Sequence, residues 1–313
     1  MAYYSGTVNN FDDLKTAIET NCVANGWTLT TSILSKNGCF FKLTSSNSGG
    51  FKFLRLDGGT GQSGSTLTGG TPGGHGTMIS ECNGHPITFP INYELHIFTN
   101  PDEVYCVVNY NSTYYQQMSF GKSDVPGIGG TGAWFTSAKQ SNQDIVNASA
   151  YNTKVFFNNL SVGYLSTEAY EGFHCGLFYG QDGSYSSSFI HANLDSLKWH
   201  GSSNSGDFFS GARTISALLQ MQPNLSNQTE ILLPIKPLAR RSANGLTILA
   251  SLKNARYVRI DNLSPGEIKT IGPDKWKCYP LFRKDTAQRN GVGWATGATH
   301  SGTFGYAIRY TGP

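Results

Sequence analysis

The sequence predicts a mainly β protein of the α+β class, with antiparallel sheets packed in a sandwich-like way, one N-terminal helix and long glycine-rich loops. Short runs of alternating apolar and polar residues are separated by clusters of Gly, Ser, Thr and Asn, which is typical of strands and turns. Glycine supplies 37 of 313 residues and charged residues only 14%, which disfavours long amphipathic helices and coiled coils. Aromatic residues make up 12%, so the chain has ample material for a core and disorder is not expected.

The N-terminal residues predict a single helix. Asn10 is a good N-cap, and Asp12 and Asp13 fall in the first turn, where the helix dipole favours negative charge. Apolar residues recur every four positions on one face, at Leu14, Ile18 and Cys22. The helix is expected to end at Asn25-Gly26, because glycine readily adopts the left-handed conformation that terminates helices.

The next part of the chain predicts strands. Residues 39–44 and 51–56 read as two strands of a hairpin, joined by the Ser-, Asn- and Gly-rich segment 45–50. Residues 57–76 contain nine glycines and predict a long exposed loop. A flexible segment of this kind suggests an arm that becomes ordered on assembly with a neighbouring subunit.

Three further strands, at 91–98, 104–110 and 114–120, predict an antiparallel meander over residues 87–121. Residues 212–221 are helix-like and are followed by Pro223. The chain closes on an alternating strand at 303–310.

The glycine-rich segment 125–132 is the best candidate for a domain boundary. It divides the chain into a helix-plus-β domain at 1–126, a Ser-, Asn- and aromatic-rich region at 127–235, and a basic segment at 236–313. We expect the basic segment to pack on the first domain.

The net charge of +3 is unevenly distributed along the chain. Residues 1–235 contain 10 Lys/Arg and 16 Asp/Glu, a net charge of 10 − 16 = −6, whereas residues 236–313 contain 13 and 4, a net charge of 13 − 4 = +9. The basic segment can therefore bind an acidic partner or the acidic part of a second copy, and a solvated basic surface is the alternative. Nucleic acid is not the expected partner, because no recognition helix or RNA-binding motif accompanies the basic residues.

The N-terminus lacks the basic and apolar regions of a signal peptide, and no apolar run reaches the length of a membrane helix. We therefore expect a soluble protein made in the cytosol, with no membrane partner. The six cysteines are scattered without CxxC spacing, which favours reduced, mostly buried thiols over zinc ligands or disulfides. They are Cys22, Cys39, Cys82, Cys106, Cys175 and Cys278.

Motifs for cofactors and metals are weak, and we predict none bound. Residues 59–64 match GxGxxG, but the following residues do not predict the helix that a dinucleotide site requires. Gly121-Lys122-Ser123 lacks the earlier glycine of a phosphate loop. The one histidine grouping has spacings that do not require a metal, and it comprises His174, Cys175, His191, Asp195 and His200.

Signs of catalysis are also weak, and we predict a protein that is not an enzyme. The carboxylate pairs Asp102/Glu103 and Glu168/Glu171 are interpreted as solvated turn residues rather than glycosidase acids. Several aromatic residues can either stack on sugars or anchor a core or interface. These are Tyr114, Tyr115, Trp134, Phe135, Trp199 and Trp294.

Segments at both ends and in the first half resemble virion structural proteins of contractile-tailed bacteriophages and related prophages. The N-terminal segments are Tyr3-Tyr4-Ser5-Gly6 and residues 22–27, and the central ones are residues 89–98 and 100–105. The C-terminal ones are residues 279–284 and 304–310. Residues 133–235 add little to the resemblance.

The resemblance implies a non-enzymatic component of the tail apparatus, in the neck, collar or baseplate, assembled in the bacterial cytoplasm and present in the virion. Its partners would be further copies of itself, in a ring-like homo-oligomer, and other tail proteins. We expect the meander 87–121 and the segment 276–310 to provide the assembly surfaces. The candidate contact residues are Tyr93, Tyr105, Tyr110, Tyr114, Tyr115, Trp276, Arg283, Lys284, Trp294, Tyr306 and Arg309.

Two other functions remain open on the sequence alone. One is a receptor- or carbohydrate-binding module on a tail fibre or tip, which would bind glycans through exposed aromatic residues in 133–235. The other is a polysaccharide hydrolase, which would need a convergent pair of carboxylates in a cleft.

Overall fold

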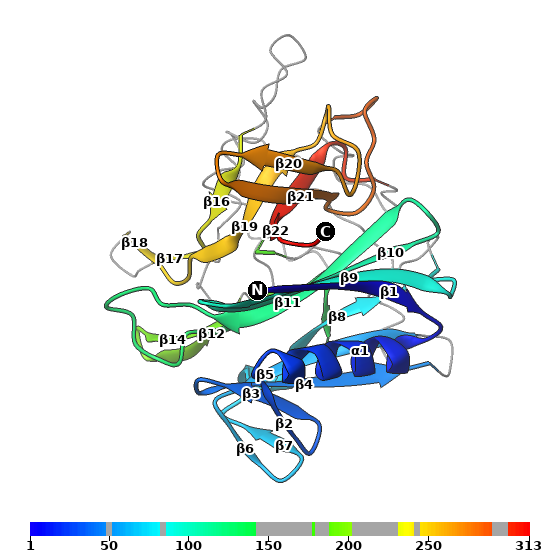
Figure 1. Ribbon diagram of the computed structural model, residues 1–313. Helices are drawn as coiled ribbons and strands as arrows, with labels where there is room; N and C mark the ends of the chain where they lie inside the picture. The colour runs from blue at the N-terminus through cyan, green and yellow to red at the C-terminus, as the bar shows by residue number, and fades with distance from the viewer. Residues whose placement is uncertain are drawn as a thin grey trace.

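A computed structural model of the chain describes residues 1–47, 52–81, 86–141, 177–178, 188–201, 231–240, 245–289 and 300–313. Three antiparallel sheets of six, seven and five strands account for most of the described chain, with two small two-stranded sheets beside them. Figure 1 shows the seven-stranded sheet in the middle, the five-stranded sheet above it, and the six-stranded sheet with the helix below it. The predicted mainly β, antiparallel fold is confirmed.

The seven-stranded sheet is the centre of the molecule. Its strand order is β1-β9-β10-β11-β12-β14-β15, and each neighbouring pair is antiparallel. The strands β9, β10 and β11 confirm the predicted meander. The bounds are β1 Ala2–Val8, β9 Ile91–Thr99, β10 Asp102–Tyr110, β11 Tyr114–Lys122, β12 Ala133–Ser137, β14 Ser188–Leu194 and β15 Leu197–His200.

The six-stranded sheet has the order β13-β8-β5-β4-β3-β2. Its strands β4 and β5 form the hairpin that the sequence predicts, with Phe41 opposite Gly58 and Leu43 opposite Leu56. The bounds are β2 Thr28–Thr30, β3 Ile33–Lys36, β4 Cys39–Ser46, β5 Phe53–Gly59, β8 Gly76–Ser80 and β13 Lys139–Ser141.

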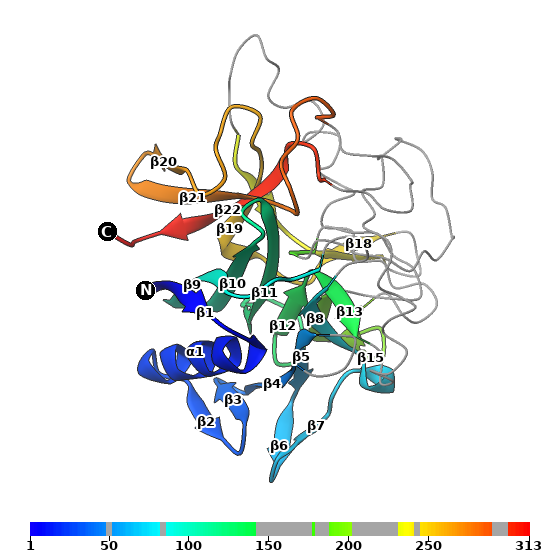
Figure 2. The same cartoon turned by 90° about the vertical axis from the view of Figure 1, so that its right-hand side faces the viewer.

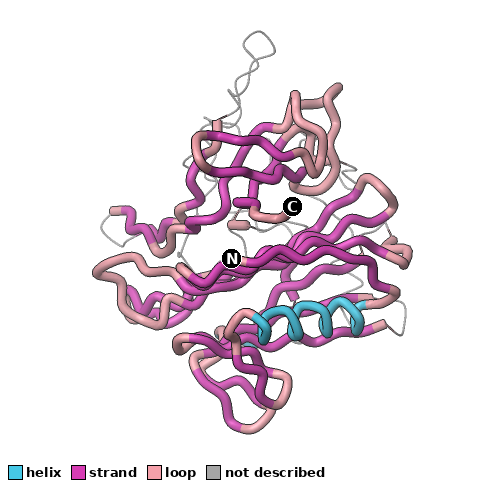
Figure 3. The backbone as a smooth tube through the Cα atoms, in the orientation of Figure 1, coloured by secondary structure: helices cyan, strands magenta, loops and turns pink. Residues whose placement is uncertain are grey.

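The helix α1, Phe11–Ala24, forms as predicted and fills the space between these two sheets (Figures 1 and 3). The Asn10 side chain accepts a hydrogen bond from the Asp13 amide at 2.8 Å, which caps the first turn. The chain leaves the helix through Gly26, whose φ of +84° suits glycine. The buried face of α1 packs on β4 and β5 on one side and on β1 and β9 on the other.

The prediction of a long exposed loop at residues 57–76 is wrong. Strand β5 continues through Gly59, and the chain then forms a small hairpin of β6, Gly61–Ser63, and β7, Thr66–Thr68. A short 3₁₀ turn, η1 Pro72–Gly74, leads into β8. Glycine is needed for packing here, because a Cβ on Gly58 would lie 2.5 Å from the Phe135 ring. The residues therefore belong to the folded protomer and do not form a free arm.

The five-stranded sheet contains the C-terminal part of the chain, in the order β16-β19-β22-β21-β20. The predicted last strand is present as β22. Figure 2 shows that the two chain ends lie on the same side of the molecule. The bounds are β16 Leu233–Ile235, β19 Leu252–Arg259, β20 Ile268–Ile271, β21 Asp274–Pro280 and β22 Phe304–Tyr310, with a separate hairpin of β17 Leu238–Arg240 and β18 Leu246–Ile248.

The segment 125–132 is a loop that joins β11 to β12, two strands of the seven-stranded sheet that pair directly. One hydrophobic core, which includes Phe11, Phe120, Phe189 and Tyr257, contains residues from all three predicted regions. The seven-stranded sheet thus continues across the proposed boundary. Most of 127–235, including the predicted helix at 212–221, lies outside the described residues.

Candidate functional site

The two segments predicted as assembly surfaces pack against each other within one chain. The backbone N–H of Tyr115, in β11, donates to the carbonyl oxygen of Phe282 at 2.7 Å. The Tyr114 and Phe282 rings lie 5.1 Å apart, and the Tyr115 and Tyr279 rings 6.4 Å apart. Much of the aromatic surface expected to face other subunits therefore joins the seven-stranded sheet to the C-terminal sheet.

Four of the predicted contact residues are buried inside the protomer, and their assignment to an exposed assembly surface is corrected. These are Tyr105, Tyr110, Trp276 and Tyr306. Burial of aromatic rings supplies much of the core's stability, and buried hydroxyls need hydrogen-bond partners. Tyr105 donates to Glu103 at 3.0 Å, and Tyr110 accepts from the Gln116 amide at 3.0 Å.

The other predicted residues are half-buried or exposed. Tyr93, Tyr114, Tyr115, Arg283 and Lys284 are half-buried and Arg309 is exposed, whereas Trp294 lies outside the described residues.

Three pairs among the predicted residues come together. The Tyr110 and Tyr114 rings are stacked, with their centres 5.6 Å apart. The Arg283 guanidinium lies 5.6 Å from the centre of the Tyr114 ring. Trp276 and Arg309 are directly opposite each other on β21 and β22, and Arg309 forms an ion pair with Asp274. Lys284 instead donates to the carbonyl oxygens of Asp261 and Leu263, at 2.9 and 2.7 Å, and so holds a loop of its own sheet.

A polar cluster around Glu94 joins β9 to β21. The Glu94 carboxylate accepts from the hydroxyls of Tyr3 and Tyr279 at 2.7 and 2.8 Å, and it pairs with the Lys277 ammonium at 2.5 Å. Burial raises the pKa of Glu94, but these three donors outweigh burial and hold the pKa below its usual value. The cluster therefore contains a carboxylate that stays ionised at neutral pH.

His96 extends this cluster into the core. Its ring is fully buried, lies 5.1 Å from the Tyr3 ring, and shares a 2.9 Å hydrogen bond between Nε2 and the Tyr279 hydroxyl. Burial lowers the pKa of His96 to about 3, so the ring is neutral at physiological pH. A neutral ring can share a proton with Tyr279 without placing a second positive charge beside Lys277.

A second buried carboxylate, Glu103, joins β10 to β19. One oxygen accepts from the Lys253 amide at 2.9 Å, and the other accepts from the Asn254 amide at 2.9 Å, the Asn254 side chain at 2.8 Å and Tyr105. Burial raises the pKa of Glu103, and these donors offset that effect only in part. The interpretation of Asp102/Glu103 as solvated turn residues is therefore wrong, because both side chains are buried.

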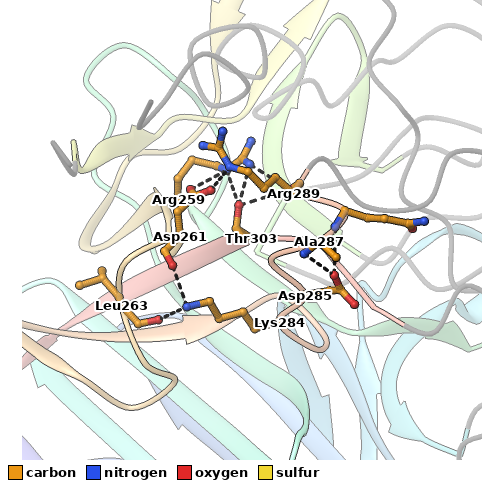
Figure 4. Close-up of polar contacts among 9 residues, drawn as sticks. Arg259, Asp261, Leu263, Lys284, Asp285, Ala287, Arg289 and Thr303 are labelled. Carbon is orange, nitrogen blue, oxygen red and sulfur yellow. Dashed lines mark hydrogen bonds and ion pairs between the residues drawn. The ribbon is translucent and has the colours of Figure 1, made fainter. Parts of the chain in front are cut away.

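A third cluster lies within the C-terminal sheet and its loops (Figure 4). The buried Arg259 donates to the Thr303 hydroxyl at 2.9 and 2.6 Å and to the Arg289 carbonyl at 2.9 Å. Asp261 lies 3.4 Å from Arg259 and forms an ion pair with Arg289. Two guanidinium groups thus share one carboxylate, an arrangement that fixes the ends of the connection between β21 and β22.

A small polar cavity of about 320 Å³ lies between the β3–β4 turn, the β11–β12 connection and Leu249. The Lys122 ammonium donates to the Asn37 carbonyl at 3.1 Å at its edge. No aromatic ring among the described residues lines it; the polar and charged lining residues are Asn37, Lys122, Ser123, Asp124 and Thr131.

The aromatic residues considered for sugar stacking or for core packing can now be placed. Trp134, Phe135 and Trp199 are buried and pack in the core. Of the two alternatives, these three residues fit the core role, since a buried ring has no face for a sugar.

The histidine grouping does not converge. His191 accepts a hydrogen bond from the Thr131 amide at 2.9 Å, and His200 accepts from the Leu194 amide at 3.4 Å. Among the described residues, no three His, Cys, Asp or Glu side chains lie where they could hold a metal ion. His174 and Cys175 fall outside that part of the chain, as does the Glu168/Glu171 pair.

Four of the cysteines, Cys22, Cys39, Cys106 and Cys278, are buried free thiols, as expected; Cys82 and Cys175 are outside the described residues. Burial raises the pKa of both Cys39 and Cys106 to about 12, so these thiols are protonated and unreactive at neutral pH. No helix in the described ranges has the length and apolar character needed to cross a bilayer.

Sequence reasoning missed Glu94 and His96 as members of a shared cluster. Glu94 and His96 are two residues apart in β9 and so lie on one face of the strand. Their partners Lys277 and Tyr279 follow almost two hundred residues later, so the sequence pattern does not connect them. No protein-family model matches this sequence, and no curated protein matches it.

Proposed function

We propose that this protein is a non-enzymatic structural component of a contractile-tailed phage particle that works by self-association. The assignment to the tail apparatus, as a neck, collar or baseplate component, rests on the sequence segments that resemble such proteins. On this proposal the chain is made in the bacterial cytoplasm and becomes part of the virion, beside further copies of itself and other tail proteins.

The observation that carries the self-association is a pair of exposed apolar edge strands on an otherwise well-packed molecule. Ile268 and Ile271 on β20 are 39% and 46% exposed, and Leu246 and Ile248 on β18 are 61% and 39% exposed. Each of these strands pairs on one side only within the described chain. Apolar side chains exposed at a surface favour contact with another chain, so these residues are candidates for self-association.

The buried ionic groups support a structural role. Glu94, Glu103 and Asp261 each link segments far apart in the sequence, and basic groups or other hydrogen-bond donors surround their carboxylates. A hydrolase would instead present a pair of carboxylates to a cleft.

Immunogold electron microscopy on purified phage particles tests the proposed place in the virion. We expect gold at the neck or tail base, with an antibody that also detects the denatured protein on a blot. Gold on fibres would support the receptor-binding alternative. Intact particles without gold, together with virion lysates that give no band, would exclude a virion component.

Sedimentation velocity on the purified protein tests self-association directly. Because association follows mass action, the weight-average sedimentation coefficient should rise with protein concentration. A coefficient that stays at the monomer value over the whole soluble range would contradict association of the free protein.

A second candidate function, a carbohydrate- or receptor-binding module on a fibre or tip, is favoured by the polar cavity beside Lys122. Its side chains and backbone can hydrogen-bond to hydroxyl groups, although none of the described residues that line it is aromatic. A glycan array tests this candidate. Binding that is lost in Lys122→Ala/Asp124→Ala would support it, and an array without signal would count against it.

A further inference from the structure

The C-terminal sheet presents lysines that have no acidic partner. Lys236, Lys253 and Lys275 are exposed, and among the described residues no carboxylate lies within ion-pair distance of them. Other lysines form ion pairs, as Lys36 does with Asp102 at 2.8 Å and Lys277 with Glu94 at 2.5 Å. The sheet therefore has uncompensated positive charge on its surface.

The hairpin of β20 and β21 combines this charge with apolar surface. Lys275 lies on β21, directly opposite Thr270 on β20, and the exposed Ile268 and Ile271 begin and end β20. Strand β20 has only four residues and includes Lys269, features that discourage another strand from pairing with its edge. A partner is therefore better accommodated through side-chain contacts on this hairpin than by strand addition.

The outer face of α1 has the complementary character. Asp12, Thr16 and Thr20 are exposed and lie on one stripe of the helix at four-residue intervals, with the exposed Val23 at its far end. Asp12 accepts from Ser45 and from the Asn47 side chain, and Asp13 accepts from the Asn9 amide at 3.2 Å, so only uncharged donors meet these carboxylates. The stripe is acidic at one end and apolar at the other.

These two surfaces lie apart on the molecule, with α1 below the central sheet and the β20–β21 hairpin above it in Figure 1. We propose that the outer stripe of α1 in one copy binds the β20–β21 hairpin of the next copy. This inference rests on the proposed function and names the two surfaces that would associate. Because the surfaces differ, the contact is heterologous and each bound copy leaves one surface of each kind free. Repetition then gives a ring if the rotation closes and a filament if it does not.

Charge exchange tests this contact in the full-length chain. The helix variant Thr16→Lys/Thr20→Lys makes the stripe basic and leaves the capping residues unchanged. The hairpin variant Thr270→Glu/Lys275→Glu makes the hairpin acidic. In a self-association of either variant, the α1 stripe and the β20–β21 hairpin would carry charge of the same sign and repel each other. We therefore expect roughly tenfold or greater weakening of self-association in sedimentation velocity.

Mixing the two variants provides the decisive measurement. The basic stripe of the helix variant can bind the acidic hairpin of the hairpin variant, and the two unchanged surfaces can bind each other. An equimolar mixture should therefore recover the association of the unsubstituted protein, and so should one chain with all four substitutions. A mixture that stays dissociated, or single variants that associate normally, would overturn the proposed contact.

Two controls show whether the substitutions act at this contact. Circular dichroism and thermal unfolding should show that both variants are folded. Thr66→Glu places the same charge on the exposed strand β7, which belongs to neither surface, and it should leave association unchanged; if it alone abolishes association, the inference is wrong. Failure of the inference with particles still labelled by immunogold leaves the proposed function intact, whereas unlabelled particles contradict the function itself.

Discussion

At the scale of single residues, the Glu94 cluster shows how much the fold depends on a few buried contacts. One carboxylate accepts from two tyrosines and pairs with Lys277, so its removal leaves three donors to find new partners. We expect Glu94→Gln to lower the free energy of unfolding at neutral pH by about 2 kcal/mol, because Lys277 would lose its charged partner while still mostly buried.

Urea unfolding followed by fluorescence measures this change. Glu267→Gln is the matched control, since Glu267 pairs with Lys269 at 3.2 Å on the surface, and it should change the free energy by no more than about 0.5 kcal/mol. Equal effects of the two substitutions would show that burial of the Glu94 cluster adds nothing to stability.

The pH dependence of stability reports on the same group. The folded-state pKa of Glu94 lies below its usual value of 4.5, so its stabilising contribution is complete above that value and is lost as the pH falls through the folded pKa. The raised pKa of Glu103 acts in the opposite sense, since it favours the folded state as the pH falls. The difference in unfolding free energy between the unsubstituted protein and Glu94→Gln isolates the first effect, and it should shrink as the pH is lowered from 7 to 3. A difference independent of pH would contradict the lowered pKa.

At the scale of elements, the sequence predicted the helix and the meander, because both depend on residues that are close together in the chain. The cap at Asn10, the four-residue apolar repeat and Gly26 act within the helix itself, and the alternation in 91–120 reflects strands that are neighbours in the chain. Burial of a polar or aromatic residue depends on distant partners instead. From the sequence, Tyr105 and Trp276 are therefore equally good candidates for an interface or for the core. Glu103 has the sequence context of a turn residue, and only the fold shows that Asn254 lies beside it.

The glycine content of residues 57–76 led to the wrong prediction of an exposed loop, because glycine is common both in flexible loops and at tightly packed positions. Gly58 lies against the Phe135 ring, so we expect Gly58→Ala to reduce the free energy of unfolding by about 2 kcal/mol through overpacking. Gly70→Ala is the control, because the nearest atom to its Cβ would be 3.5 Å away, and it should change stability by less than about 0.5 kcal/mol. Thermal denaturation compares the two, and an unaffected Gly58 variant would favour the loop.

Glu103 on β10 links the central sheet to the C-terminal sheet by accepting hydrogen bonds from β19. In Glu103→Gln a side-chain amide must face the N–H groups of Lys253 and Asn254, so one of these donors loses its acceptor. Hydrogen exchange should therefore become at least about tenfold faster at the amide that loses its acceptor, while the amides within α1 keep their protection. Unchanged exchange at both would mean that the pairing of β19 with its neighbouring strands holds this strand in place without Glu103.

At the scale of the whole molecule, hydrophobic packing joins the three sheets, whereas net charge differs between the two parts of the chain. Packing unites the three sheets, since aromatic residues of β19, β21 and β22 belong to the same core as α1 and the central sheet. Charge divides the chain, with −6 before residue 236 and +9 after it. A sequence with opposite net charge in its two parts is suited to directional association, because the parts of different copies attract each other.

Continuity of the core predicts that residues 236–313 do not form an independent domain. Tyr257, Tyr279 and Tyr306 of the C-terminal sheet are at most 1% exposed and pack with residues of the central sheet. Separation would expose these rings, and Glu103 would lose the donors of Asn254 and Glu94 the ammonium of Lys277. A chain that ends at residue 235 should therefore bind a hydrophobic dye strongly and unfold without a sharp transition, and co-expression with 236–313 should restore a soluble complex. In calorimetry the full chain should give one transition for both sheets, because neither is stable alone. Two separate transitions, with a soluble and cooperatively folded 1–235 fragment, would instead support an independent C-terminal domain that docks through the same contacts.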